Sequence, residues 1–443
     1  MISRSRWTRA AADQRGAVLI QVAVALLALL ALSAFVFDYG VMWASRGQAQ
    51  TSADAGALAG AISLAFDNAT DQDGARARAI VMASRNRVLG QAPSVGDPDV
   101  TFPPCPPGAP GLADTCVKID VFRNQTRGNA LPMFFGRLSG VESQGVRATA
   151  TAQIATGDTT DCLKPWAIID RWDEYNAAGG EPDYPTPDSD FGPTSTFDKF
   201  SSGQGNNPPA EPDLYIAPGP SRPGTGFRLP NDLGRQFAIK VDTNNTATVS
   251  SGWFRAIRLP RLDGQSGGSV YRSNIESCGG LPASFAGPST QPCPANIGTG
   301  DAAYWATQGC FATEPGNMVG PTAAGIETLI GRDPHASWGA SGIHNSAFDP
   351  PTSSPRVVPI GVLDIENFLA QDPSGGNGVL RLVNIYGFFV EGMGDVDATT
   401  GATTLNTNGK SVIGRLMTIP AKGTGAGKLP ADASFLRTII LVR

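Results

Sequence analysis

Cysteine is the residue type in this sequence whose number and spacing carry the clearest chemistry. The six cysteines are Cys105, Cys116, Cys162, Cys278, Cys293 and Cys310. None of them forms the C-x-x-C pair typical of zinc sites. All six follow the apolar run at residues 16–37, so they are expected outside the cytoplasm, in an oxidising compartment where an even count favours three disulfides. Local pairing suggests Cys105 with Cys116, and Cys293 with either Cys278 or Cys310. A reactive catalytic thiol is not expected in such a compartment.

Histidine, the usual general base near neutral pH, occurs only as His335 and His344. Asp333 and Asp349 lie nearby in the sequence, but chance neighbours of this kind are common, so we expect two exposed loop histidines. The sequence contains no G-x-S-x-G elbow, Walker A loop or H-E-x-x-H helix. It therefore predicts no catalytic residue, no cofactor and no metal site.

The charge of the chain argues against one class of partner. The net charge is −5, and no basic cluster lies beyond the N-terminus. Nucleic-acid binding needs a clustered basic face that neutralises phosphates, so it is not expected. The 53 glycines and 35 prolines favour a loop-rich protein with more strand than helix beyond its N-terminal region.

The long apolar run at residues 16–37 decides on which side of a membrane the cysteines, the histidines and the rest of the chain lie. Its sequence, GAVLIQVAVALLALLALSAFVF, contains no charge. At about 1.5 Å per residue, such a helix crosses a hydrocarbon core about 30 Å thick. Residues 1–15 are basic and Asp38 follows the run. The positive-inside rule therefore predicts a single-pass inner-membrane protein with a cytoplasmic N-terminus and a periplasmic or extracellular remainder.

Cleavage at the start of the apolar run is the alternative to a retained anchor. A glycine before an apolar helix suits a prepilin-type peptidase, which would cut between Gly16 and Ala17. Pilins carry an acidic residue five positions into the mature chain, where this sequence has Gln21. A retained anchor is therefore preferred, and a pilin-like subunit processed after Gly16 is the alternative.

The alanine-rich sequence after the apolar run predicts a helical stalk within residues 38–90. Its small residues include Ala53, Ala57, Gly60 and Ala61. Small side chains let helices approach closely, so this face would pack against partner membrane helices or a second copy of the stalk. A second helix is predicted to begin at Asp71 and to end near Gly90.

The remainder of the chain predicts a small module and a larger domain. Residues 91–156 form a β-rich module, because residues 117–122 and 146–154 alternate apolar and polar side chains. A short helix is predicted between these strands, at residues 131–138.

Residues 157–443 form an exported α+β or mainly β domain with a loop-rich insertion near residues 176–235. A helix is predicted at residues 322–331. Regular structure is predicted to return at residues 237–241 and 247–258, and strands are predicted at residues 357–363, 379–389, 411–419 and 437–442.

The N-terminal sequence resembles a known family in a pattern of separated residues. The pattern is an Arg-Gly pair, an Asp after the apolar run, and a Gln followed by an Ala-Asp-Ala run. The matching residues are Arg15, Gly16, Asp38, Gln50, Ala53, Asp54, Ala55, Ala57 and Ala59. Residues 15–61 resemble the N-terminal segment of Flp pilus-assembly TadG-like proteins of the bacterial tight-adherence (Tad) system. Residues 116–155 resemble the strands that commonly follow in that family.

The resemblance implies a membrane-anchored component of Flp pilus assembly or surface adhesion, structural rather than catalytic, with other Tad subunits as partners. An envelope hydrolase is a further alternative without a visible nucleophile and base. Some family members carry a von Willebrand factor A domain with an Asp-x-Ser-x-Ser metal loop. Here Asp372-Pro-Ser374 is followed by two glycines, so that metal site is not expected.

Overall fold

The computed structural model describes residues 15–67, 71–105, 116–175, 191–197, 213–241, 249–261, 264–286, 292–298, 300–316, 318–340, 342–365, 378–423 and 428–442. The basic segment before residue 15, parts of the insertion predicted near 176–235, and the string at 372–374 lie outside these residues.

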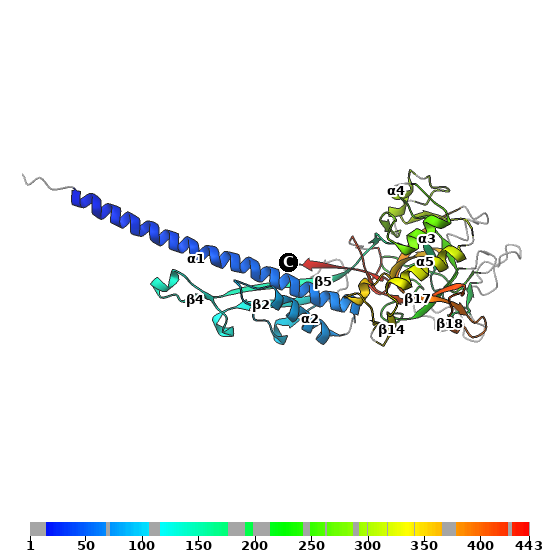
Figure 1. The fold of residues 1–443 in the computed structure, drawn as a ribbon, viewed down its shortest axis with the longest axis horizontal. Helices are drawn as coiled ribbons and strands as arrows, with labels where there is room; N and C mark the ends of the chain where they lie inside the picture. The colour runs from blue at the N-terminus through cyan, green and yellow to red at the C-terminus, as the bar shows by residue number, and fades with distance from the viewer. Residues whose placement is uncertain are drawn as a thin grey trace, which may run out of the picture.

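The first element is one unbroken helix, α1 (Arg15–Ile62), of 48 residues and therefore about 72 Å long. It projects from the molecule as a rod (Figure 1), and its apolar N-terminal half is exposed. The predicted layout, a long apolar N-terminal helix followed by a mixed strand-rich region with helices, is confirmed.

A short π-helical turn (Ser63–Asp67) follows α1, and α2 (Gln72–Arg85) then packs back along it. The carboxylate of Asp71 caps α2 by accepting a hydrogen bond from the backbone N–H of Gly74 at 2.8 Å. The helix ends earlier than the predicted limit near residue 90, because the backbone turns extended at Asn86.

An N-terminal sheet packs against the second half of α1. Its strands, in spatial order, are β1 (Val100–Thr101), β2 (Cys116–Arg123), β5 (Val146–Thr156), β21 (Leu436–Val442) and β20 (Ile419–Pro420). The last strand of the chain, β21, runs antiparallel to β5 and ends beside α1 (Figure 1). The sequence division at residue 156 leaves this strand with the larger domain, whereas the structure pairs it with the N-terminal strands.

The prediction of a helix at residues 131–138 is wrong. The chain forms β3 (Leu131–Pro132) and β4 (Ser143–Gln144), which pair with each other, and the short 3-10 helix η4 (Gly136–Ser139) lies between them. Pro132 favours an extended backbone at Leu131, where β3 begins, and within the predicted range helical backbone forms only in the 3-10 turn η4.

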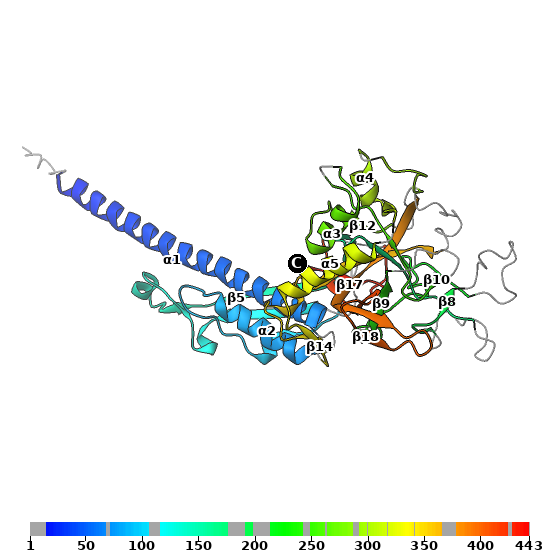
Figure 2. The ribbon, with the colours of Figure 1, turned by 45° about the vertical axis from the view of Figure 1, so that its right-hand side comes forward.

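The larger unit is built on an eight-stranded, mainly antiparallel sheet (Figure 2). Its strands are β7 (Trp166–Ile169), β9 (Gln236–Lys240), β11 (Phe254–Ala256), β13 (Cys310–Ala312), β16 (Val357–Leu363), β17 (Val379–Val396), β18 (Thr403–Leu405) and β19 (Ser411–Met417). Only β7 and β16 pair in parallel among these described strands. The long central strand β17 extends past the predicted end at residue 389 and pairs with four neighbours.

Three helices cover this sheet: α3 (Gly268–Glu276), α4 (Ala302–Thr307) and α5 (Val319–Arg332). The helices α3 and α5 pack together, and α5 also contacts β17. The remaining short elements are β6 (Thr159–Thr160), β8 (Thr196–Phe197), β10 (Val249–Ser250), β12 (Ala283–Ser284), β14 (Ser337–Gly339), β15 (Gly342–His344) and the 3-10 turns η2 (Asp97–Asp99), η3 (Gln125–Arg127) and η5 (Pro351–Ser353).

Candidate functional site

The exposed half of α1 is long and apolar enough to cross a membrane. Its leucines project freely, with Leu27 67% and Leu30 63% exposed, and no side chain of the described residues covers them. The residues at the alternative processing position lie at its start, with Gly16 and Ala17 in the first turn and Gln21 exposed. An uncovered surface of this kind needs an apolar surrounding, which a bilayer provides.

Asp38, directly after the apolar run, fastens the helix to the connection between β3 and β4. Its buried carboxylate accepts hydrogen bonds from the backbone N–H groups of Phe134, Phe135 and Gly136, at 2.9, 3.0 and 2.6 Å. Charge-assisted bonds of this type are the stronger kind. The ring of Phe37 meets the rings of Phe134 and Phe135 edge-on, at 5.3 and 5.7 Å. We call this arrangement the Asp38 latch.

A second set of polar contacts joins α1 to the sheet and to α2. The amide of Gln50 donates to the carboxylate of Asp54 at 2.8 Å and to the carbonyl oxygen of Thr149 on β5 at 3.1 Å. The buried hydroxyl of Ser52 donates to the carbonyl oxygen of Ala83 on α2 at 2.8 Å. Asp38 and Gln50 belong to the family pattern, and both join α1 to other parts of this chain.

The small-residue face of α1 is occupied inside the molecule. Ala49, Ala53, Ala57 and Ala61 recur every four residues and are fully buried. A Cβ at Gly56 would lie 2.7 Å from Ile119 Cδ1, and one at Gly60 would lie 2.9 Å from Val117 Cγ1. The prediction that this face packs against partner helices or a second copy is therefore wrong, because β2 and α2 already cover it.

All six cysteines form disulfides, as the even count predicts. The pairs are Cys105–Cys116, Cys162–Cys278 and Cys293–Cys310. The alternative pairing of Cys278 with Cys293 is not found, because the end of α3 packs beside the chain that enters β7. This contact joins residues 116 positions apart, which local spacing cannot reveal.

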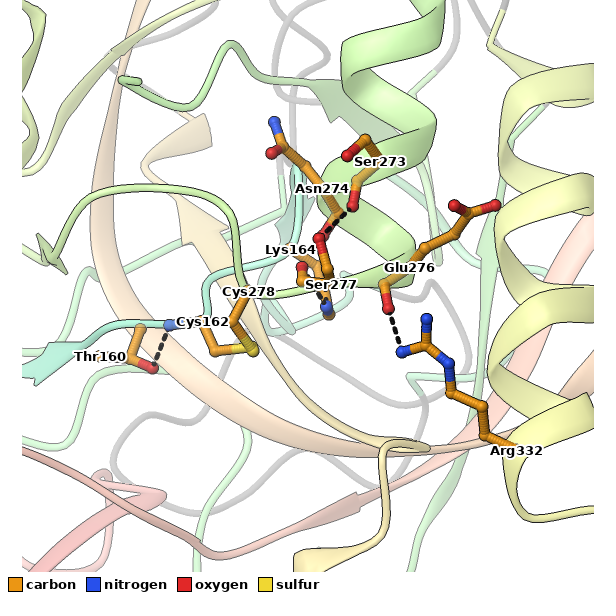
Figure 3. The surroundings of a disulfide bond; sticks show 9 residues. All are labelled: Thr160, Cys162, Lys164, Ser273, Asn274, Glu276, Ser277, Cys278 and Arg332. Atoms are coloured by element: carbon orange, nitrogen blue, oxygen red, sulfur yellow. Dashed lines mark hydrogen bonds between the residues drawn. A yellow bond between two sulfur atoms is a disulfide. The ribbon is translucent and has the colours of Figure 1, made fainter. Parts of the chain in front are cut away.

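The Cys162–Cys278 disulfide lies beside the last turn of α3 (Figure 3). The amine of Lys164 donates to the carbonyl oxygens of Asn274 and Ser277 there, at 3.2 and 3.1 Å. A helix leaves its last carbonyls without partners and carries a partial negative charge at that end. The buried amine therefore serves as a cap for α3.

Two buried ionisable groups of the larger unit have shifted pKa values. Burial, assisted by the positive charge of Arg332, lowers the pKa of Lys164 to about 7. Burial raises the pKa of Asp170 to about 6, against the opposing effect of the hydrogen bond donated by the Tyr386 hydroxyl at 2.6 Å. Shifted pKa values occur in structural networks as well as in active sites. Lys164 bonds to the last turn of α3 and Asp170 bonds to the buried hydroxyl of Tyr386, so both ionisable groups have a structural role.

The histidines do not form a site. His335 lies exposed in the turn after α5, and His344 is exposed on β15. The neighbouring Asp333 is buried and accepts hydrogen bonds from the hydroxyls of Ser346 and Ser354, at 2.7 and 2.6 Å. Among the described residues, no group of three His, Cys, Asp or Glu side chains could hold a metal ion.

A cleft of about 720 Å³ lies where the π-helical turn after α1 meets the larger unit. Its lining includes Arg78 and Arg415, and each is paired with a carboxylate, Asp67 at 3.2 Å and Glu391 at 2.9 Å. Paired charges at a junction between two units favour a contact surface over a reaction centre.

In its described residues the protein thus combines one helix long and apolar enough to span a membrane, a small sheet packed on the second half of that helix, and a larger disulfide-bonded unit. Residues 16–63 match the family model Tad, described as "Putative Flp pilus-assembly TadE/G-like". The match covers α1 from its second residue and the first residue of the π-helical turn, and it supports involvement in the Tad system. No curated protein and no solved structure matches the chain.

Proposed function

We propose that this protein is a membrane-anchored component of Flp/Tad-type pilus assembly or surface adhesion, with a structural rather than a catalytic role. The observation that carries the proposal is the family match at residues 16–63, which coincides with the exposed anchor and the fastened stalk. Both histidines are exposed, and among the described residues no group of three His, Cys, Asp or Glu side chains could hold a metal ion, which favours a structural role over an envelope hydrolase.

The proposed orientation places the N-terminus in the cytoplasm and the two folded units outside the inner membrane. The basic residues before the apolar run support it through the positive-inside rule. The three disulfides support it as well, because disulfides persist in oxidising compartments such as the bacterial periplasm. Other Tad subunits are the proposed partners.

The test is the amount of Flp pilin sheared from cells that carry an in-frame deletion of this gene. We expect loss of sheared pilin and its recovery with the wild-type gene. A Leu27→Lys/Leu30→Lys double variant should fail to restore it, because two charges at the centre of the span oppose insertion. The matched control, Tyr304→Lys/Leu405→Lys, places the same charges on exposed residues of the larger unit and should restore it. Unchanged pilin in the deletion strain would contradict the proposal.

A pilin-like subunit processed after Gly16 is the second candidate. The specific observation in its favour is the continuity of α1, whose uncovered apolar half could pack in the core of a fibre as well as in a bilayer. The intact mass of the mature protein separates the two, since processing would leave residues 17–443. A full-length mass would exclude the second candidate.

A further inference from the structure

The connection between β3 and β4, residues 133–142, carries a concentration of exposed apolar side chains. We call it the hairpin tip. Its exposed apolar residues are Phe134 (54%), Phe135 (43%), Leu138 (88%) and Val141 (37%). Leu138 is the most exposed large apolar side chain of the described residues. Exposed apolar groups gathered in one place mark interaction sites more often than scattered ones do.

The hairpin tip is held at the end of the apolar run by the Asp38 latch. Three backbone N–H groups of the tip bind the Asp38 carboxylate, and Phe37 packs against the rings of Phe134 and Phe135. In Figures 1 and 2 the loop beside β4 extends along α1 toward its N-terminus, away from the larger unit. Its apolar side chains therefore continue the apolar surface of the anchor.

We propose that the hairpin tip inserts into the lipid interface of the membrane that α1 crosses, on the side of the folded units. This inference rests on the proposed anchor. The partner of the hairpin tip is lipid. The bilayer surrounds α1 as far as Phe37, and the rings of Phe134 and Phe135 touch Phe37, so the same bilayer reaches the tip. The tip thus gives the protein a second membrane contact, which sets the tilt of the stalk and the orientation of the units beyond it.

Aromatic side chains on the opposite face of α1 fit the same depth. Tyr39 and Trp43 are 57% and 69% exposed. At about 100° per residue they point roughly 200° and 240° away from Phe37, so they lie on the side of the helix that faces away from the tip. Tyrosine and tryptophan favour the membrane–water interface. The protein thus presents aromatic groups to lipid on both sides of the helix.

The charges of the tip indicate that apolar contact, and not charge, drives its insertion. Arg137 and Glu142 are both exposed and cancel each other. The long side chain of Arg137 can keep its guanidinium in the headgroup region while the neighbouring Leu138 enters the apolar layer. Insertion should therefore persist in vesicles without anionic lipid.

The test places a photoreactive benzophenone amino acid at one exposed leucine at a time in the full chain. The positions are Leu30 in the span, Leu138 in the tip and Leu405 in the larger unit. The protein is reconstituted in phosphatidylcholine vesicles, with and without phosphatidylglycerol, and adducts are identified by mass after illumination. All three side chains are largely exposed, so the substitutions should leave folding intact.

We expect lipid adducts from positions 30 and 138 in both kinds of vesicle, and none from position 405. Adducts at 30 without adducts at 138 would overturn the tip proposal and leave the anchor in place. Adducts at 138 to a second protein chain would also overturn it, in favour of a protein-docking loop. Absence of lipid adducts at 30 would instead contradict the anchor, so the two failures are distinguishable.

Discussion

The two folded units of this protein have cores of opposite character. The core of the N-terminal unit is made largely of alanine, from α1, α2 and β5: Ala49, Ala53, Ala57, Ala61, Ala75, Ala79, Ala83, Ala148, Ala150 and Ala152. The core of the larger unit is aromatic, and its largest fully buried side chains include Trp166, Trp172, Trp253, Phe227, Phe388 and Phe389.

The two cores differ in how they are held in one packed conformation. Alanine buries little apolar area, so the N-terminal unit gains close approach of helix and sheet and depends on polar contacts such as the Asp38 latch for its register. The larger unit gains stability from bulky side chains and long-range crosslinks. Truncation should therefore damage the larger unit most, and enlargement should damage the N-terminal unit.

Truncation of the aromatic core should have the largest effect. We expect Phe388→Ala to lower the free energy of unfolding of the larger unit by about 3–5 kcal/mol, through lost burial and the cavity left behind. Ala57→Gly in the other core removes one methyl group and should cost about 1 kcal/mol. Denaturant unfolding of the detergent-solubilised protein measures both. Equal losses of unfolding free energy in the two variants would contradict the proposed difference between the two cores.

Removal of disulfides should show the same contrast in crosslinking. The Cys162→Ala/Cys278→Ala variant opens a separation of 116 residues, and Cys105→Ala/Cys116→Ala opens one of 11. Loop entropy predicts a loss of about 5 kcal/mol for the first pair and about 3 kcal/mol for the second. Thermal unfolding of the two variants against wild type gives the order, and a larger loss from the short loop would contradict this account.

Enlargement of the alanine core should destabilise the N-terminal unit. Gly56→Leu must displace Ile119 or α2, and we expect a loss of about 1–3 kcal/mol. Gly47→Leu is the matched control on the same helix, where an added Cβ meets nothing within 4 Å. Amide hydrogen exchange in β2 and β5 reports on this unit. Similar exchange in the two variants would show that the helix does not lie as closely on the sheet as described.

Weakening of the Asp38 latch should loosen the tip without unfolding either unit. Asp38→Asn keeps the size of the side chain and removes its charge, which should cost about 1 kcal/mol. Faster amide exchange is expected at Phe134, Phe135 and Gly136. Asp73→Asn is the control, since that carboxylate is exposed and pairs only with Arg76 among the described groups. Unchanged amide exchange at the tip would show that the hydrogen bonds to Asp38 do not hold it in place.

The last prediction is a pH dependence of stability in the larger unit. Lys164 has a pKa of about 7 when folded and an ordinary value of 10.5. The unfolded chain binds more protons between these values, so this group makes stability rise with pH across that window. Wild type should therefore gain stability relative to Lys164→Met between pH 7 and 10. A constant difference between the two proteins would show that the amine is not perturbed.

Local patterns predict the elements of this fold but not their long-range partners. The apolar run, the stalk and the strand at residues 357–363 follow from composition and periodicity. The pairing of β21 with β5 does not, because a short apolar strand does not indicate which sheet it joins. The small residues of α1 signal close packing correctly, but their partners are the protein's own sheet and α2.

The candidate site was predictable in part. An apolar run flanked by basic residues indicates an anchor from sequence alone. The role of Asp38 was not predictable, because its partners lie almost a hundred residues away. The available signals were a charged residue directly after the apolar run and the family-like sequence at residues 116–155, which contains Phe134, Phe135 and Gly136.

The most direct test of the central claim is the location and length of the native protein in cells that produce pili. Membranes and sheared fibres are separated, and the N-terminal peptide and intact mass are determined in each fraction. We expect the full-length chain in the membrane fraction and not in the fibres. A chain that begins at Ala17 and travels with the sheared fibres would contradict it.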